Sequence, residues 1–318
     1  MNRASWKSVI LIILIITSPL FAELPAQTSN FASPAYWGMA HSGAAIAEIN
    51  NTYLLNPSLV PFSSSWSVNI NEAFIPGMQI SISELSGHYI FKESHALNGG
   101  INFENYGTFE QRDINGNLNG EFSAAQYQVF LGYAYKMSDY FQAGAQLVFQ
   151  GNRISTSREN SLYLRYGLSY SFAKQNDMIA FSGISDGLDN AWRASFSHEL
   201  EYLPLRVNID FRWQGDDWSQ SLLLDDENNF NFQKASRYFA QKLSIGFYIK
   251  ASENLRIMSG VDLARLDLAS NNYGLDNLLS GLALGASYTF GNMDINLGIY
   301  HYTNYTMMTA LGVSYSAE

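Results

Sequence analysis

Hydrophobic and polar residues alternate along most of the chain, most clearly in Leu162–Phe172. The apolar parity of this stretch consists of Leu162, Leu164, Tyr166, Leu168, Tyr170 and Phe172. The other parity carries a charge, hydroxyls and a glycine, among them Arg165, Gly167 and Ser169. A period of two predicts a β-strand. The second face is too polar for the core of a sandwich, so we expect lipid on one side and a lumen on the other.

Similar runs recur from Ser65 to the end of the chain and predict about fourteen strands. They are Trp66–Phe74, Met78–Phe91, Leu97–Asn105, Ala125–Tyr135, Phe141–Gly151, Leu162–Phe172, Met178–Ile184, Trp192–Leu200, Leu205–Trp213, Phe239–Lys250, Leu255–Leu263, Leu282–Phe290, Met293–Tyr300 and Met307–Tyr315. An even count is what a single-chain bacterial outer-membrane barrel requires. Small residues crowd the inner parity, which favours a narrow or plugged lumen over an open pore.

The connections between these runs alternate in length. Short joins fall at Lys136–Asp139, Lys174–Asp177, Ala251–Asn254 and Gly291–Asn292, and longer ones at Glu110–Glu121, Asn152–Ser161, Gln214–Arg237 and Ala264–Asn277. Outer-membrane barrels have short periplasmic turns and longer outer loops. The sequence therefore predicts an all-β fold, a transmembrane antiparallel β-barrel over residues 65–318.

Residues 23–64 do not alternate, and we expect this segment to lie inside the lumen as a plug. Gly38–Ile49 is rich in small residues and weakly helical. Small residues such as Gly38 and Gly43 permit close packing against a wall, and Asn56 with Pro57 is typical of a turn. The alternative is an N-terminal cap or a loose leader.

The first 22 residues have the order of a secretory signal peptide. Arg3 and Lys7 precede the apolar run Val9–Ile16, and Ser18–Ala22 follows it, which predicts cleavage after Ala22 or alternatively after Ala26. No later stretch has the roughly 18 apolar residues of a transmembrane helix, so any span of a membrane must be a closed barrel. We therefore expect the bacterial outer membrane as the location.

The amino-acid composition limits the kinds of partner that the protein can bind. Twenty Tyr, twenty Phe and six Trp suit the aromatic girdles of a membrane barrel. Removing residues 1–22 takes away Arg3 and Lys7 and no acid, so the net charge moves from −10 to −12. A chain this acidic, without a basic stripe, repels phosphate, which excludes nucleic acid. The absence of cysteine excludes disulfides and Cys-ligated metals.

The inner parity of Leu205–Trp213 is the most charged of any predicted strand. It carries Arg206, Asp210 and Arg212, and Arg165 lies on the inner parity of Leu162–Phe172. These side chains are candidates for a ligand or ion path. The simpler reading is lumenal pairing, for example with Asp262 or Glu72, which fills and stiffens the interior.

No pattern indicates catalysis, a metal or a cofactor. The five histidines have no metal-ligand spacing, and neither a nucleophile elbow nor a phosphate-binding glycine loop is present. Asp113 begins a segment similar to a calcium loop, but Leu118 and Ala124 occupy its sixth and twelfth positions, so a solvated turn is favoured. The acidic run Asp225–Glu227 is also read as an exposed loop.

Several short motifs resemble the PorV/PorQ family of outer-membrane barrels. They are the segment Gly38–Pro57 with its Asn56-Pro57-Ser58, Tyr106-Gly107-x-Phe109-Glu110, Asp113 through Gly120-x-Phe122-Ser123-Ala124, Gly132-Tyr133-Ala134, Ser138-Asp139 and, as in the PorQ branch, Pro204-Leu205-Arg206. The resemblance implies a FadL-like fourteen-stranded barrel with its N-terminal segment inside. It also implies a non-catalytic role in type IX secretion, within a surface complex that attaches exported proteins to the cell envelope.

The leading hypothesis is therefore an outer-membrane anchor that contacts lipid and other attachment-complex proteins at the cell surface. A FadL-like transporter of hydrophobic small molecules is the alternative, and a soluble secreted β protein is the third. A continuous apolar channel favours transport, and a filled lumen favours anchoring. The predicted docking loop Gln214–Arg237 carries apolar side chains typical of an interface core, Trp218, Leu222, Leu223, Leu224, Phe230 and Phe232, which alternatively form a lid.

Overall fold

The structure is a computed structural model, and it describes residues 33–46, 49, 52–112, 115, 117–172, 177–185, 190–214, 232–240, 242–263, 265, 279–303 and 306–317. The predicted signal peptide and part of the predicted plug lie outside these residues. Among the residues that the structure describes, no helix has the length and apolar character needed to span a bilayer.

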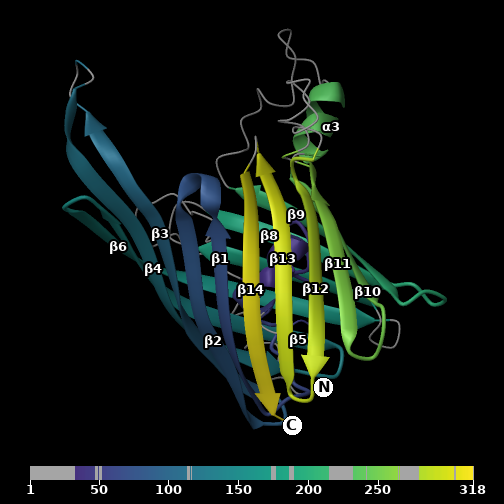
Figure 1. Cartoon of the computed structure of the whole chain (residues 1–318). Helices are drawn as coiled ribbons and strands as arrows, with labels where there is room; N and C mark the ends of the chain where they lie inside the picture. Colours follow the sequence, from purple (N-terminus) through teal and green to yellow (C-terminus); the bar gives the residue numbers. More distant parts are fainter. Residues whose placement is uncertain are drawn as a thin grey trace.

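Fourteen antiparallel strands close into a barrel, which confirms the predicted fold (Figure 1). The strands are β1 Trp66–Ile75, β2 Ile80–Lys92, β3 His95–Arg112, β4 Leu118–Lys136, β5 Phe141–Ile154, β6 Ser157–Phe172, β7 Asp177–Ser185, β8 Asn190–Glu199, β9 Leu205–Gln214, β10 Leu243–Lys250, β11 Leu255–Asp262, β12 Leu282–Phe290, β13 Met293–Thr303 and β14 Thr306–Ala317. Each strand pairs with its sequence neighbours, and β1 pairs with β14 to close the sheet. Closure leaves no strand edge around the ring, which is what a lipid environment requires.

Period-two alternation decides which side chains face out. On β6, Leu162 and Leu168 are exposed on the outer surface, whereas Arg165 and Ser169 are buried in the interior. On β1, Val68 and Ile70 face out, and Asn69 and Asn71 face in. An exposed outer surface this rich in Leu, Ile, Val and Tyr suits contact with lipid acyl chains.

Two of the predicted long loops are wrong, because the strands continue through them. Glu110 of β3 pairs with Glu121 of β4, and β5 and β6 run to a two-residue turn at Ser155 and Thr156. The rings of Phe109 and Phe122 stack across the β3–β4 pair at 5.4 Å. Almost all residues of these outer hairpins are exposed on both faces, so the alternation that marks the lower strands disappears although the pairing persists. Figure 1 shows the β3–β4 pair rising beyond its neighbours.

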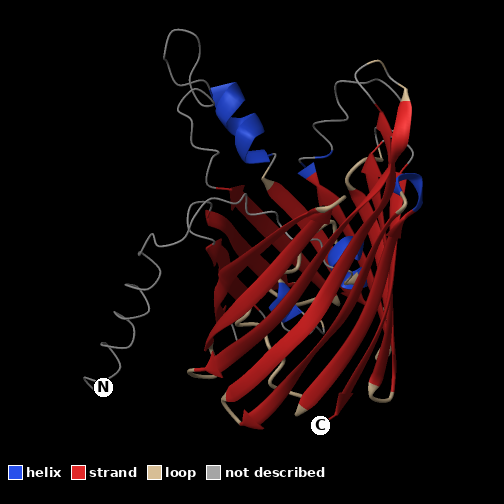
Figure 2. Ribbon diagram, turned by 90° about the vertical axis from the view of Figure 1, so that its left-hand side faces the viewer, coloured by secondary structure: helices blue, strands red, loops and turns tan. Residues whose placement is uncertain are grey.

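The remaining helices lie at the barrel mouth and inside the lumen. The helix α3 Phe232–Ala240 stands at the rim opposite the C-terminus, so the start of the predicted strand Phe239–Lys250 is wrong. The 3-10 helix η2 Pro76–Met78 links β1 to β2 and replaces the predicted strand start at Met78. The helix α2 Pro34–Gly38 and the 3-10 helix η1 Thr52–Leu54 lie within the barrel (Figure 2).

Candidate functional site

The described part of residues 33–62 fills the lumen, and we call this segment the plug. Its α2 begins with Pro34, whose fixed φ suits the first turn of a helix, and packs against β11, β12, β13 and β14. Trp37, Met39, Tyr53 and Leu59 are at most 1% exposed. The lumen therefore has an apolar core to which the plug and inward-facing wall residues both contribute, among them Phe130, Val148, Tyr300 and Met308.

Three cross-strand pairs of glycines in the wall receive the plug backbone. They are Gly144 with Gly167 on β5 and β6, Gly246 with Gly260 on β10 and β11, and Gly285 with Gly298 on β12 and β13. A side chain on these glycines would meet Pro57 and Asn56, Ser42 and Met39, and Gly38 and Pro34, respectively. Glycine permits this approach of two backbones because it has no Cβ.

The predicted plug residues lie at these contacts or beside them. A Cβ on Gly38 would lie 2.9 Å from the Gly285 Cα. Gly43 has a φ of 105°, which favours glycine, and lies against the side chain of Met39. The Asn56 side chain donates to the Leu168 carbonyl at 3.4 Å and accepts from the backbone of Ser58 at 3.1 Å. This Asx turn presents Pro57 to Gly144.

A network of charged residues meets the plug on the side opposite the C-terminus. In the register of the sheet, Ser195, Asp210, Ser244 and Asp262 form one row across β8–β11, and Arg193 with Arg212 forms the adjacent row. Arg212 donates to Asp262 at 2.9 Å and to Ser244 at 2.7 Å. Arg193 lies 4.0 Å from Asp210. The row with the two arginines thus lies beside the row that holds the two carboxylates.

The plug enters this network through His41 and Ala44. His41 Nδ1 lies 3.2 Å from Asp262 Oδ2 and 3.3 Å from Arg212 Nη1, and the Ala44 amide donates to Asp210 at 3.4 Å. His41 and Ala40 both have φ in the left-handed region, at 67° and 51°, which is uncommon for residues other than glycine. The contacts of the surrounding network hold this backbone conformation.

Aromatic rings enclose the imidazole of His41. The Tyr36 ring stacks on it at 4.8 Å, and the rings of Trp37 and Tyr300 approach to 4.5 and 4.6 Å. Burial in this cage lowers the pKa of His41 from 6.5 to about 4, with a smaller contribution from the nearby Arg212. His41 is therefore neutral at pH 7, and a proton on it would be placed beside two arginines.

All four charges predicted for the lumen face inward, but only Asp210 and Arg212 belong to this network. Arg165 is fully buried and donates to Gln146 at 2.8 Å, and Arg206 pairs with Glu199 at 2.7 Å near the opposite barrel end. Asp262 is a partner of Arg212, as expected, whereas the proposed lumenal partner Glu72 is wrong because it lies on the outer face of β1.

Sequence reasoning did not find the part played by His41, Tyr36 and Arg193. No periodic pattern marks the plug, and only the closed barrel brings these residues to Arg212. The predicted docking residues Trp218, Leu222, Leu223, Leu224 and Phe230 lie outside the described residues. Phe232 is the first residue of α3 and is 77% exposed.

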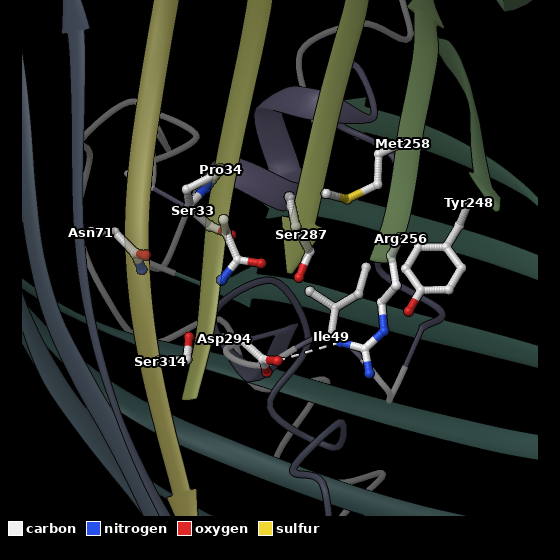
Figure 3. A pocket seen from close by; sticks show the side chains of 12 residues that line it. Ser33, Pro34, Ile49, Asn71, Tyr248, Arg256, Met258, Ser287, Asp294 and Ser314 are labelled. Carbon is white, nitrogen blue, oxygen red and sulfur yellow. Dashed lines mark ion pairs between the residues drawn. The ribbon is translucent and has the colours of Figure 1, made fainter. Parts of the chain in front are cut away.

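Two cavities adjoin α2. The first is a small hollow with a mainly apolar lining, which includes Ala35, Tyr36, Met39, Ile49, Leu54 and Leu55. The second is also small and lies between α2 and the short-turn end of the barrel, where polar and apolar atoms contribute about equally to its lining (Figure 3). Within the described ranges, no group of three or more His, Asp or Glu side chains is arranged to hold a metal ion.

Comparisons with known proteins identify solved structures that share the fold of this chain. No protein-family model and no curated protein matches the chain. Solved structures do match it across nearly its whole length. The Ralstonia pickettii toluene transporter TbuX is 13% identical, with 90% of this chain and 98% of that chain covered and a TM-score of 0.59.

Two further structures match similarly. The Pseudomonas putida toluene transporter TodX is 12% identical, with coverage of 93% and 99% and a TM-score of 0.58. A Pseudomonas aeruginosa FadL homologue is 11% identical, with coverage of 93% and 100% and a TM-score of 0.54. The chain has a FadL-like fold. This agrees with the coarser part of the predicted resemblance, and the PorV/PorQ assignment remains a prediction.

Proposed function

We propose that the protein is an outer-membrane channel for the uptake of small apolar molecules, closed in this structure by its plug. The observation that carries the proposal is the FadL-like fold of the closed barrel, whose plug leaves a small hollow with an apolar lining beside α2. Apolar side chains such as Met39 and Leu54 offer a small hydrocarbon the same surroundings as a protein core.

The barrel surface supports a location in the outer membrane. The closed sheet satisfies backbone hydrogen bonds around the ring, and exposed Leu, Ile, Val, Phe and Tyr cover the outer surface. Such a barrel is stable in a bilayer and would expose a large apolar surface in water. The known structures with this fold include proteins described as toluene transporters and a monoaromatic hydrocarbon channel.

Uptake of radiolabelled toluene by intact bacterial cells tests the proposal. Cells that express the barrel should take up toluene faster than cells without it. Leu55→Trp places a larger side chain at the apolar cavity and should reduce the gain, whereas Phe62→Trp makes a similar change in a plug residue that does not line this cavity. Heat-modifiable gel migration establishes that both variants form barrels. Equal uptake with and without the wild-type barrel would refute the proposal.

A second candidate is the anchoring of a surface complex in type IX secretion. It is supported by the filled lumen and by the short sequence motifs that resemble the PorV/PorQ family. The docking partner would contact the connection between β9 and β10, which contains Leu223 and Phe230. Affinity capture from detergent-solubilised outer membranes tests this role. Leu223→Asp combined with Phe230→Ala should lose a co-purifying surface protein at unchanged barrel abundance.

A further inference from the structure

A second polar cluster lies on the lumen wall away from the charged network of β8–β11. Asn102 of β3 is at its centre, and its register partners on either side are Glu84 of β2 and Gln128 of β4. Glu104 is the next inward residue of β3. Register partners lie about 5 Å apart and alternate residues of a strand about 7 Å apart, so long side chains at these positions can reach one point. We call these residues the oxygen cluster.

Each side chain of the oxygen cluster is buried and offers an oxygen atom. All of them are at most 3% exposed. Within the part of the chain that the structure describes, one enclosed oxygen of each accepts no hydrogen bond, namely Glu84 Oε2, Asn102 Oδ1, Glu104 Oε1 and Gln128 Oε1. The Gln128 amide nitrogen donates to Gln150 of β5 at 2.8 Å, so its oxygen is directed away from β5. Enclosed acceptors usually have a partner because leaving one without it is costly.

Hydrogen bonds hold the two carboxylates of the oxygen cluster through their other oxygen. Glu84 Oε1 accepts a hydrogen bond from Asn71 at 3.0 Å and another from Ser86 at 3.0 Å. Glu104 Oε2 accepts a hydrogen bond from the Tyr106 hydroxyl at 2.7 Å. Contacts of this kind orient the carboxylates that bind metal ions in proteins.

The neighbouring wall positions carry no basic residue. The two rows across β14, β1, β2, β3, β4 and β5 are Gly312, Asn71, Glu84, Asn102, Gln128 and Gln150, and Ala310, Ala73, Ile82, Glu104, Gln126 and Asn152. All of these positions lie within the described part of the chain, and none of them is Lys or Arg. On the opposite wall, by contrast, Asp210 and Asp262 lie beside arginines. Buried carboxylates are stable when they pair with a cation or coordinate a metal ion.

We infer that the oxygen cluster binds a calcium ion. The two carboxylates balance its charge, and with the amide oxygens they approach the roughly six to eight oxygen ligands that calcium takes. The ion lies about 2.4 Å from each ligand, closer than a hydrogen-bonded water at about 2.8 Å, so oxygens that water does not reach can still surround it. Mg²⁺ suits the cluster less well because it retains several of its own waters. This site is independent of the proposed uptake function.

Calcium binding by the purified, full-length barrel in detergent tests the inference. Equilibrium dialysis of the EDTA-treated barrel against radioactive calcium should give about one bound ion per chain, at an affinity at least about tenfold higher than that for Mg²⁺. Calcium should also raise the unfolding temperature relative to EDTA, because an ion that binds only the folded barrel stabilises it.

Matched variants locate the ion. Glu84→Gln and Glu104→Gln each remove one charge at nearly constant shape and should weaken calcium binding at least about tenfold. Glu72→Gln removes the same charge from the outer face of β1 and should bind calcium as the wild type does. Heat-modifiable gel migration establishes that each variant forms a barrel.

The sign of the stability change distinguishes a metal site from a structural role. In EDTA, Glu84→Gln relieves repulsion between two like charges and should raise the unfolding temperature, whereas in calcium it should lower that temperature. The same change in both conditions would assign Glu84 a structural role only.

Three further results would overturn the inference. A folded wild-type barrel that binds no calcium has no such site. Calcium binding that survives in both Glu84→Gln and Glu104→Gln places the ion elsewhere, and equal affinity for Mg²⁺ contradicts the selection of calcium.

Discussion

Arg212 on β9 reaches across β10 to Asp262 on β11, where its guanidinium donates to the carboxylate at 2.9 Å. Ser244 of the intervening strand accepts a second hydrogen bond from the same nitrogen. Because His41 of the plug contacts both partners of this ion pair, the pair joins three wall strands and the plug.

Arg212→Met should loosen the plug. Asp262 would lose its buried cation, a change that typically costs about 3 kcal/mol or more. The expected result is a higher conductance of the purified barrel in planar bilayers. Arg158→Met removes an exposed arginine from the outer end of β6 and should leave conductance unchanged. A closed Arg212→Met channel with wild-type conductance would show that the ion pair does not hold the plug.

Acid should also favour release of the plug. In the seated plug the pKa of His41 is about 4, whereas a released His41 has its ordinary value of 6.5. The released state therefore binds the proton more tightly. Above pH 6.5 His41 is neutral in both states and does not oppose seating of the plug, whereas the seated state loses free energy relative to the released state as the pH falls from 6.5 towards 4. The difference corresponds to about 3 kcal/mol.

Conductance measured from pH 7.5 to pH 4 tests this dependence, and it should rise below pH 6.5. Other groups that face His41 are Arg193, Arg212, Asp262, Tyr36 and Tyr300. His41→Asn separates its contribution from theirs, since asparagine does not titrate and tolerates the left-handed backbone. The same pH response in this variant would assign the effect to another group.

Gly285→Val should displace α2. Its Cβ would lie 3.0 Å from the Gly38 Cα, and valine adds two more carbon atoms in a space occupied by the plug backbone. We expect a folded barrel with raised conductance. Ala286→Val, the adjacent residue on the opposite face of β12, is the control. Equal conductance of both variants would show that Gly285 does not determine the seating.

A cysteine at Ala44 should be shielded while the plug is seated. Ala44 is 1% exposed, and the chain has no native cysteine to react. Labelling of intact protein with a bulky aqueous maleimide at pH 7 should be at least about tenfold slower than that of Tyr202→Cys, whose parent residue is 92% exposed. Rapid labelling at Ala44 would contradict a stably closed lumen. The related position Ala47 lies outside the described residues.

Lysine at Leu168 should impair barrel assembly more than lysine at Ser169. Leu168 is exposed on the outer surface, and Ser169 faces the lumen. A lysine facing lipid near the midplane costs roughly 2–4 kcal/mol, whereas a lumenal lysine remains away from the acyl chains. The fraction of heat-modifiable protein in the outer membrane measures assembly. Equal loss in both variants would contradict the assigned facing.

The barrel itself was predictable because lipid imposes a simple rule on each strand. Residues on the outward parity of a strand, such as Leu162 and Leu168, are apolar. This alternation can be recognised in the sequence without knowledge of any long-range contact. The alternation ends in the outer hairpins, where both faces are exposed, so the paired hairpin around Phe109 and Phe122 was predicted as a loop. Glu72 was assigned to the lumen because of its charge, although it shares the outward parity of Val68 and Ile70.

The candidate site was only partly predictable because it depends on contacts between distant residues. His41 and Asp262 are separated by 221 positions, and their approach follows from strand order and register. Small inward residues indicated a plugged lumen. Their arrangement in facing glycine pairs, such as Gly144 with Gly167, became visible only when neighbouring strands were aligned.

Because of these glycine pairs, the plug also fits only a barrel whose strands are paired in the correct register. A slip of two residues between β5 and β6 would keep every side chain on its proper face, because the period of a strand is two. It would nevertheless separate Gly144 from Gly167 and bring the side chain of Arg165 or Ser169 opposite Gly144. Pro57 and Asn56 would then meet a side chain where they now meet two bare backbones. The plug thus fits a barrel closed in one register and discriminates against slipped alternatives that lipid alone would accept.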